Sequence, residues 1–242
     1  MGASDTDRRE LRLLHASDCH LGASPRPTAN EAAFVALVDL AMGEDVDAVL
    51  VSGDLFDTPR VHGEMLDWTI DQLHRLACPV VVLPGNHDWF EDQSPFRTVD
   101  FEQRCRHVHV LDERGGELLE LSELGVTFYG RAVHDHEPWF RPLADLPPRP
   151  VSGWGVLMGH GLVVDSDHPS TRGSPIYPRD LACIDWDYVA LGHWSRYWHV
   201  QSEPVPVVYA GNTACSQGER PGCVMVELSP DRGVTPTWTP LG

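Results

Sequence analysis

The stretch Leu11-Arg12-Leu13-Leu14-His15-Ala16-Ser17-Asp18-Cys19-His20 joins an apolar run to a carboxylate and an imidazole one residue apart. Four later strand-like runs also end in metal-ligand chemistry. They are residues 48–52 before Gly53-Asp54, 79–83 before Gly85-Asn86-His87-Asp88, 155–158 before Gly159-His160, and 188–191 before Gly192-His193. Open α/β sheets place their ligands at the carboxyl ends of strands, and glycine lets the backbone turn sharply there. This order predicts a metal-dependent hydrolase.

These motifs, with Trp194 and Ser195 following Gly192-His193, resemble those of the calcineurin-like metallophosphoesterases. The similarity runs from Leu11 to about Leu228, which is nearly the whole chain. It implies an α/β fold, a four-layer sandwich in which two mixed β-sheets pack face to face with helices outside. It also implies a single catalytic domain over residues 1–242, with the polar residues 1–10 expected to be disordered.

The residues that flank the motifs are most similar to those in the catalytic domains of Mre11/SbcD-type DNA repair exonucleases. The similar stretches are His15-Ala16-Ser17-Asp18-Cys19-His20-Leu21-Gly22, Ser52-Gly53-Asp54-Leu55-Phe56-Asp57, Asp187-Tyr188-Val189-Ala190-Leu191-Gly192-His193-Trp194, Tyr209-Ala210-Gly211-Asn212 and residues 222–228. The resemblance implies a phosphodiesterase of nuclease-like lineage, in which a metal-bound hydroxide attacks the phosphorus in line.

By the same resemblance, two divalent cations would share one carboxylate. The implied ligands are Asp54 as the bridge, Asp18 and His20 at the first metal, and Asn86, His160 and His193 at the second. Oxygen and nitrogen ligands without thiolate suit Mn, Fe or Zn, of which we favour Mn. A single Gly-Asp pair is more often a turn, and a single histidine is more often ordinary. Their joint occurrence favours ligands, and Cys19 is expected to be a small buried residue pointing away from them.

His87 follows an implied ligand but is not expected to bind metal. Beside a substrate phosphate, its imidazole could stabilise charge or protonate the leaving oxygen, with Asp88 orienting the ring and raising its basicity. The alternative is that Asp88 caps or pairs nearby and His87 merely packs. The sequence therefore indicates His87 and Asp88 as candidate catalytic residues.

Ser195 departs from the family pattern, which has a histidine ligand of the first metal at this position. A neutral hydroxyl is a poor ligand for Mn, Fe or Zn. A water could fill the gap, His199 could swing in although residues 197–200 read as a strand leaving the site, or the first site could be weak or empty. Since all implied ligands of the second metal are present, that metal is expected to bind more tightly.

The first third of the chain alternates strands with helical periodicity, which favours a parallel sheet. Thr28 is expected to cap a helix over residues 31–44, and a second helix is expected over residues 63–76. Later strands are expected at residues 108–111, 117–121, 126–129, 205–209, 224–228 and 234–238, with hairpin turns at residues 114–116 and 231–233.

Composition narrows the class of protein. The 242 residues, 42% of them hydrophobic, can bury one full core. No apolar run approaches the ~20 residues of a membrane span, and the polar start argues against a secretory signal. Six cysteines without C-x-x-C spacing are expected to be free thiols, so we expect a cytoplasmic protein. The net charge of −18 weakens nucleic-acid binding without excluding it.

Three functions stay open from the sequence. The leading hypothesis is a phosphodiesterase of nuclease-like lineage acting on a phosphoester, with nucleic acid as one candidate substrate. We expect no capping domain or ATPase-partner segment after the core, which favours instead a phosphomonoesterase or a small-molecule phosphodiesterase. The third is a non-catalytic binding module that has lost a metal, supported by Ser195 and opposed by His87. The sequence indicates neither the natural substrate nor the oligomeric state.

Overall fold

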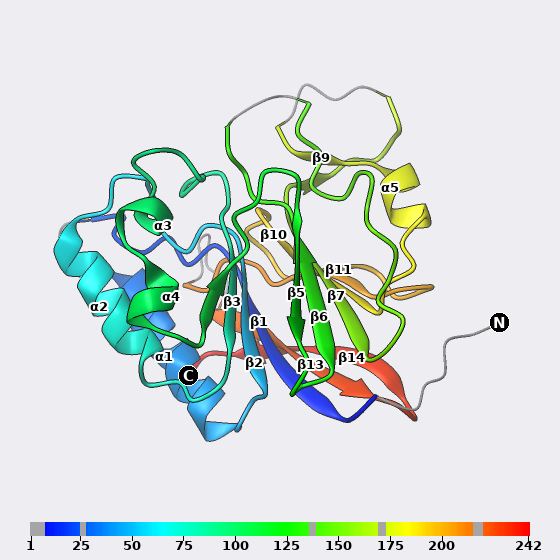
Figure 1. The fold of residues 1–242 in the computed structure, drawn as a ribbon, viewed down its shortest axis with the longest axis horizontal. Coiled ribbons are helices and arrows are strands. Elements are labelled where there is room, and N and C mark those ends of the chain that lie inside the picture. The colour runs from blue at the N-terminus through cyan, green and yellow to red at the C-terminus, as the bar shows by residue number, and fades with distance from the viewer. Residues whose placement is uncertain (1–7, 25–27, 136–138, 169–172, 215–219) are drawn as a thin grey trace.

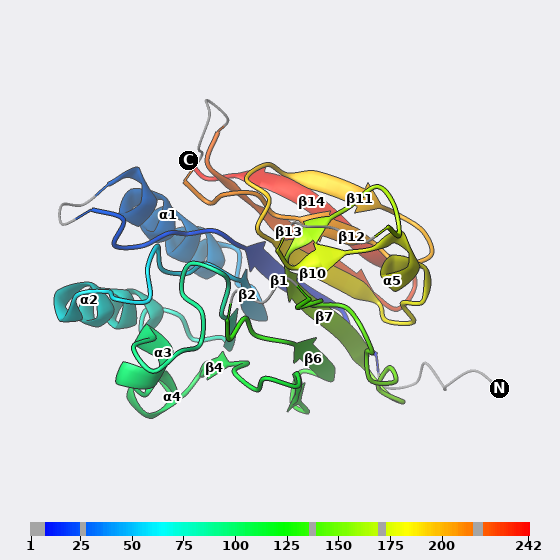
Figure 2. The same cartoon turned by 90° about the horizontal axis from the view of Figure 1, so that it is seen from above.

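Two six-stranded β-sheets pack face to face, with helices on their outer sides (Figure 1). The computed structural model describes residues 8–24, 28–135, 139–168, 173–214 and 220–242. Figure 2 shows α1 to α4 at one side of the sheets and α5 at the other. The α/β sandwich of two mixed sheets that the sequence predicts is therefore confirmed.

The first sheet carries the motifs of the N-terminal third. Its strand order is β14 (Gly233–Pro240), β13 (Gly222–Ser229), β1 (Leu11–Ala16), β2 (Ala48–Ser52), β3 (Val80–Leu83) and β4 (Val108–Val110). Strands β1 to β4 are parallel, whereas β13 pairs antiparallel with both β1 and β14. The carboxyl ends of β1, β2 and β3 consequently lie at one edge of this sheet.

The second sheet carries the two later motifs. Its strand order is β11 (Trp198–Gln201), β12 (Val207–Tyr209), β10 (Tyr188–Gly192), β7 (Trp154–His160), β6 (Val126–Gly130) and β5 (Glu117–Leu121). Its four inner strands are parallel, and the edge strands β5 and β11 are antiparallel to their neighbours. A separate pair is formed by β8 (Leu162–Val163) and β9 (Pro175–Ile176). Every residue of β7 and β10 is buried, which fixes the ends that carry the histidines.

The helices are α1 (Ala29–Gly43), α2 (Gly63–Leu73), α3 (Pro95–Thr98), α4 (Phe101–Arg104) and α5 (Pro178–Ala182). The predicted cap of α1 is confirmed, because the Thr28 side chain accepts a hydrogen bond from the Asn30 N–H and the Glu31 side chain accepts one from the Thr28 N–H. Such a capping box satisfies amide groups that the first turn leaves without partners. Both long helices lie where hydrophobic periodicity predicts them.

Alternation along β1 places the core on both faces of the first sheet. Leu11 and Leu13 lie between the sheets, in a cluster that includes Phe128 and Trp154 of the second sheet. Leu14 belongs to the cluster under the helices. Burying one such side chain contributes roughly 1.5–3 kcal/mol. The strand ends that carry the motifs are therefore anchored from both sides.

The predicted hairpin at residues 114–116 is wrong. The strand before it, β4, lies in the first sheet, and the strand after it, β5, lies in the second. This turn therefore carries the chain from one sheet to the other. The hairpin at residues 231–233 is confirmed, since it joins β13 to β14. Periodicity identified both pairs of strands but contained no information on which strands pair.

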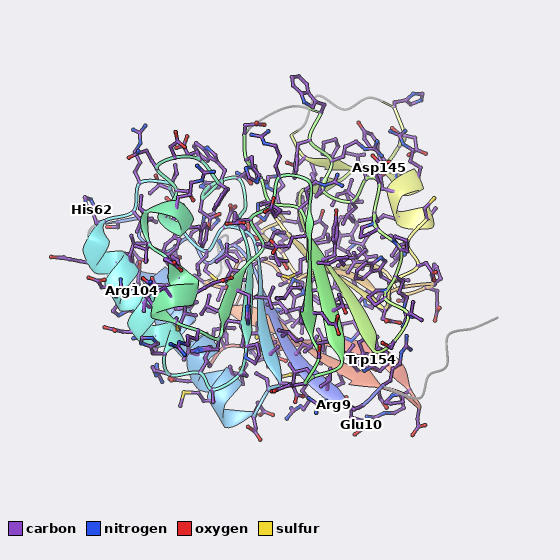
Figure 3. The ribbon with its side chains drawn as sticks, viewed as in Figure 1. Arg9, Glu10, His62, Arg104, Asp145 and Trp154 are labelled. Atoms are coloured by element: carbon purple, nitrogen blue, oxygen red, sulfur yellow. The ribbon has the colours of Figure 1, made fainter. Side chains whose placement is uncertain are left out.

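The described part of the N-terminal segment packs against the start of β7. Residues 1–7 of the ten that were expected to be disordered lie outside the described residues. Arg8 forms an ion pair with Asp187 at 2.7 Å. The carbonyl of Arg9 accepts a hydrogen bond from the Trp154 indole at 2.8 Å, and both residues are labelled at the lower end of the sheets in Figure 3.

Five cysteines are free thiols, as expected, and Cys215 lies outside the described residues. Cys19 is buried, and its Sγ lies 3.5 Å from the Thr213 hydroxyl, so it turns into the core as predicted. None of the helices in the described ranges is long and apolar enough to cross a membrane.

Candidate metal centre

The predicted ligand loops meet at one edge of both sheets. They follow β1, β2 and β3 in the first sheet and β7 and β10 in the second. His160, the last residue of β7, donates a hydrogen bond from Nδ1 to the Ser52 carbonyl at the end of β2, at 2.9 Å. This bond joins the two sheets, and it leaves Nε2 as the ring nitrogen that faces the centre.

The implied ligands of the second metal form a closely spaced group. His160 Nε2 lies 3.1 Å from Asp54 Oδ2 and 2.8 Å from Asn86 Oδ1. His193 Nδ1 lies 2.7 Å from the same Asn86 oxygen. Donor atoms from the carboxyl ends of β2, β3, β7 and β10 are thus linked by three close contacts.

These spacings fit a shared cation. Two ligand atoms bound to one ion at about 2.1 Å each, at roughly a right angle, lie about 3 Å apart. The three neighbouring pairs, His193 with Asn86, Asn86 with His160 and His160 with Asp54, lie 2.7, 2.8 and 3.1 Å apart. Carboxylate, amide and imidazole donors without thiolate suit Mn, Fe or Zn. The residues present therefore fit the second of the two expected ions.

The implied ligands of the first metal are more widely spaced. Asp18 Oδ1 lies 3.8 Å from His20 Nε2, while Asp18 Oδ2 accepts a hydrogen bond from the His193 backbone N–H at 3.0 Å. Ligand atoms of Asp18, Asp54 and His160 lie within 4.8 Å of one another. Asp54 thus stands where a bridge between the two groups would have to be.

Ser195 does not take the place of the absent imidazole. Its backbone carbonyl accepts a hydrogen bond from the Asn212 N–H at 3.1 Å, and its hydroxyl makes no hydrogen bond with a described residue. His199, the candidate substitute, lies on β11 opposite Val208, and its Nε2 lies 3.4 Å from the Ser202 hydroxyl. Among the described residues, neither Ser195 nor His199 therefore forms a hydrogen bond with an implied ligand.

Backbone strain marks the same loops. Seven non-glycine residues in the described ranges have positive φ, and four of them are implied ligands: Asp18 at 51°, His20 at 48°, Asp54 at 55° and His193 at 91°. This region costs side-chain-bearing residues of order 1–3 kcal/mol each, and such strain concentrates at functional sites. The fold holds these four side chains in orientations that a relaxed turn would not give.

Two glycines allow the loops to approach each other. A Cβ on Gly53, where φ is 92°, would lie 1.9 Å from His160 Nδ1. A Cβ on Gly192 would lie 1.8 Å from the Ser52 carbonyl oxygen. Any side chain at either position would push β7 and β10 away from β2, so the Gly-Asp and Gly-His motifs have a packing reason as well as a chemical one.

The charges in the centre are buried and complementary. Burial by itself would raise the pKa of Asp54, but the charge and hydrogen bond of His160 outweigh it and hold that pKa below the usual range. Burial would lower the pKa of His160, and the Asp54 carboxylate instead raises it to about 9. Burial and repulsion from His160 lower the pKa of His193 to about 4, which keeps its imidazole in the neutral form that binds metals.

A family model for calcineurin-like phosphoesterases matches residues 11–197. The chain belongs to this family. Members use divalent metals, and two clusters in the described ranges could hold such ions in this phosphoesterase: Asp18 with Asp54 and His160, and His20 with Asp57 and His87. It is 26% identical over 226 residues to the uncharacterized metallophosphoesterase YhaO of Bacillus subtilis (strain 168), which covers 84% of this chain and 53% of that protein. The chain thus spans about half the length of this curated relative.

Two solved structures show how widely this phosphoesterase fold occurs. One is the purple acid phosphatase PPD1 from yellow lupin seeds, with a TM-score of 0.62, 13% identity, and coverage of 96% of this chain and 52% of the lupin chain. The other is described as a novel archaeal phosphodiesterase, with a TM-score of 0.53, 13% identity, and coverage of 95% and 100%. At these identities the likeness shows the fold alone.

Asp88 does not orient His87, contrary to the prediction. Its Oδ1 accepts a hydrogen bond from the Gly85 N–H at 2.7 Å, and its Oδ2 accepts one from the Phe56 N–H at 3.0 Å. Asp88 therefore ties the Asn86 loop of this phosphoesterase to the Asp54 loop. Burial, and then repulsion from Asp54, raise its pKa to about 7. Adjacency in sequence suggested a catalytic partner, but the turn directs this carboxylate backward into the core.

The carboxylate that faces His87 belongs to Asp57, which the sequence interpretation missed. His87 Nδ1 donates a hydrogen bond to the Asp57 carbonyl at 3.1 Å and lies 3.6 Å from Asp57 Oδ1. The same Oδ1 lies 3.1 Å from His20 Nδ1. The sequence did contain a signal for this residue: Asp57 lies three residues after Asp54, at the end of a stretch that resembles the Mre11/SbcD-type proteins.

Proposed function

We propose that this protein is a metal-dependent phosphodiesterase of nuclease-like lineage. The observation that carries the proposal is the chain of close contacts that runs from His193 through Asn86 and His160 to Asp54, with Asp18 beside Asp54. When bound, two divalent cations would supply an activated water and neutralise the charge on the phosphoryl oxygens. The donor set favours Mn, with Fe or Zn as alternatives.

The chain's own residues would hold the reacting groups in place. Asp54 stays ionised because its pKa is held low, and it lies in one group with Asp18 and His160, so it would be the residue that bridges the two ions. The His160 ring is fixed by its bond to Ser52, so its Nε2 can point only at the centre. An outer hydrogen bond of this kind fixes the orientation of a ligand imidazole, which favours metal binding.

His87 is the candidate general acid. Its Nδ1 is used by the Asp57 carbonyl, so Nε2 is left to donate a proton to the leaving oxygen. Its backbone N–H donates to Asp54 Oδ1 at 2.8 Å, which places the residue at the rim of the centre. Its side chain is 45% exposed, so a substrate can reach it. The neighbouring Asp18, Asp54 and His160 are almost fully buried and are poorly placed for this task.

The proposed substrate class rests on the residues that flank the motifs. The Mre11/SbcD-like stretches support a diester, whereas the fold is shared with a phosphatase and with a phosphodiesterase and does not choose between them. A net charge of −18 argues against tight binding of DNA by this chain alone, because Lys and Arg contacts to phosphates normally supply that affinity. We therefore propose small phosphodiesters, or nucleic-acid ends presented by a partner. The free thiols are in keeping with a cytoplasmic location.

The test compares substrates under one metal condition at a time. Bis(4-nitrophenyl) phosphate, 4-nitrophenyl phosphate, and short single- and double-stranded DNA are incubated with Mn, Zn and Fe in parallel. We expect turnover of the diester that chelation abolishes, and weak binding of both DNAs even at low salt. Preference for the monoester would identify a phosphatase. Tight duplex binding with processive degradation would identify a complete nuclease.

A non-catalytic binding module is the second candidate, favoured by Ser195 alone. It predicts metal binding at the second site, no turnover of any phosphoester with any metal, and no change on restoring the imidazole. The retention of His87 at the rim, with its ring held by Asp57, supports the enzyme instead.

A further inference from the structure

We propose that Trp194 and Trp198 form an aromatic platform that holds the nucleobase of a nucleotidyl phosphodiester beside the metal centre. This inference rests on the proposed function, because it names the substrate class of the same site. It makes the protein a phosphodiesterase of nucleotide esters whose affinity for substrate comes from stacking rather than from cationic side chains.

Exposed aromatic side chains gather in one segment of the chain. Trp194, Tyr197 and Trp198 are 38%, 36% and 40% exposed, and they lie within five consecutive residues that directly follow the implied ligand His193. Single exposed apolar residues are ordinary on protein surfaces, whereas a cluster of them indicates a binding surface. The other exposed large hydrophobic residues of the described ranges are scattered: Met42, Leu118, Trp139 and Val151.

The register of the second sheet places Trp198 at the ligand edge. Trp198 is the first residue of β11 and pairs with Tyr209, the last residue of β12. Tyr209 pairs in turn with Leu191 of β10, and Leu191 pairs with Gly159 of β7. The next row along β7 carries the ligand His160. Trp198 therefore stands one row of residues away from the metal ligands of this sheet.

Tyr209 holds the Trp198 ring in place. The two rings are stacked, with centroids 5.8 Å apart and an interplanar angle of 12°. Tyr209 is fully buried, and its hydroxyl donates to the Gly161 carbonyl at 2.7 Å and accepts from the Val163 N–H at 2.8 Å. One face of the Trp198 indole is thus covered by a fixed ring, and its exposed area is left on the other face and the edges. A ring that is already fixed loses little conformational entropy when a ligand binds.

Trp194 forms a second wall beside Trp198. The centroids of the two indoles lie 6.3 Å apart, and their planes meet at 60°. The backbone between them is packed closely, because Gly211 has a φ of 82° and a Cβ there would lie 2.7 Å from the Tyr197 amide nitrogen. Since Trp194 directly follows His193, the corner between the two indoles adjoins the metal centre.

A corner of this kind suits a planar heteroaromatic group. One face of a base can stack on one indole while its edge meets the other, and every base has a face that can stack. The net charge of −18 makes phosphate contacts a poor source of affinity, whereas stacking does not depend on net charge. His87, the candidate acid for the leaving oxygen, follows β3 in the first sheet. We therefore assign to the platform, on the second sheet, the ester group that stays on the phosphate.

The experiment uses two chromogenic diesters that differ only in the base-bearing group. Thymidine 5′-(4-nitrophenyl phosphate) and methyl 4-nitrophenyl phosphate share one leaving group and one metal chemistry. Their kcat and KM are compared in wild type, Trp194→Ala, Trp198→Ala, Trp198→Leu and Trp198→Tyr. Trp139→Ala is the matched control, since Trp139 is a 70% exposed tryptophan in another loop. Circular dichroism checks that each variant folds.

A second measurement needs no turnover. Thymidine 5′-monophosphate and ribose 5-phosphate are titrated separately into the zinc-loaded protein, and their proton resonances are followed. Stacking on an indole should shift the thymine resonances upfield through the ring current. We expect this shift in wild type and Trp139→Ala, and we expect Trp198→Ala to lose it.

Wild type should prefer the thymidine ester, mainly through a lower KM. Trp198→Ala should reduce this preference roughly 5–100-fold, the effect of removing one stacking ring. Trp194→Ala should reduce it less, Trp198→Tyr should retain most of it, and Trp139→Ala should leave it unchanged. A full preference in Trp198→Leu would reveal plain apolar contact and would overturn the stacking proposal. Ribose 5-phosphate binding as tightly as thymidine 5′-monophosphate would overturn it in favour of a sugar site.

Failure of the platform and failure of the proposed function give different results. If wild type hydrolyses neither diester, the proposed function fails, and the thymine resonances still decide whether the platform binds a base. If both diesters are hydrolysed and Trp198→Ala matches Trp139→Ala in substrate preference and in the resonances, only the inference about the platform fails.

Discussion

The two halves of the centre differ in how tightly their donors are held. In the half assigned to the second metal, donor atoms lie 2.7–3.1 Å apart, and the side chains of His160 and Asp54 are 1% and 2% exposed. In the half assigned to the first metal, Asp18 and His20 are 3.8 Å apart, and position 195 carries a hydroxyl instead of an imidazole. One half is a closed ligand cage. The other opens toward His87, where a substrate can enter.

Asp54 is the residue that both halves share, so its substitution should have the largest effect. Asp54→Asn removes the buried charge that would bridge two cations and that also balances His160. We expect loss of both manganese equivalents in a calorimetric titration and diester hydrolysis below detection. Circular dichroism checks that the variant folds. A folded variant that kept two manganese ions would show that Asp54 is not the bridge.

His87→Asn tests the open half separately from the metals. Turnover of a diester with a poor leaving group should fall by about 100-fold or more, the usual size of a lost general acid, while both manganese equivalents remain. His62→Asn is the matched control, because His62 is an exposed histidine that precedes α2 and makes no contact with an implied ligand in the described ranges; Figure 3 shows it at the outer end of that helix. Loss of metal from His87→Asn would make His87 a ligand and would remove the distinction between the halves.

The closed half was the easier of the two to predict from sequence. Each of its ligands lies at the end of a buried strand or within three residues after it, and parallel strands bring their carboxyl ends to one edge. Asp54, Asn86, His160 and His193 could therefore be named before their distances were known. The packing of two mixed sheets was implied by the resemblance to the calcineurin-like family, while periodicity indicated where the strands and helices lie. That β4 and β5 lie in different sheets could not be predicted, because strand pairing depends on contacts between distant residues.

The open half depends on the directions in which its loop side chains point, and these directions cannot be read from the motifs. Positive φ at Asp18, His20 and Asp54 folds each loop back on itself, and this places Asp57 beside two imidazoles. The same turn chemistry sends Asp88 into the core, although it follows His87 directly. A motif lists which residues are present, whereas the carboxylate that serves a given histidine is decided by backbone geometry.

Asp88→Asn should damage the closed half through structure rather than chemistry. The amide can accept only one of the two backbone hydrogen bonds that Asp88 accepts, so one buried N–H loses its partner at a cost of about 1–3 kcal/mol. Measured at pH 8, above the pKa of about 7 of this carboxyl, the melting temperature should drop by roughly 2–4 °C for each kcal/mol lost. Affinity for the second metal should fall with it.

Asp180→Asn is the control for this prediction. Asp180 is another buried carboxylate that accepts a backbone hydrogen bond, from Tyr177, and it lies in α5 away from the ligands. It should lower the melting temperature and leave manganese affinity unchanged. If Asp88→Asn instead left stability intact and slowed turnover alone, Asp88 would serve His87 after all.

Ser195→His should make the two halves more alike, and it is the smallest effect expected. A restored imidazole would add one nitrogen donor to Asp18 and His20, so first-site manganese affinity should rise by at least about tenfold, the lower end of the changes that ligand surroundings produce. The second site should not respond, because its donors come from other loops. Calorimetric titration at limiting manganese measures both sites in one experiment.

An unchanged first site in a folded variant would mean either that another group already completes it or that the position 195 side chain points away. Repeating the titration with Ser195→Ala separates these outcomes: a further loss of affinity would show that the hydroxyl, or a water it holds, is already part of the first site, and no loss would show that position 195 lies outside it.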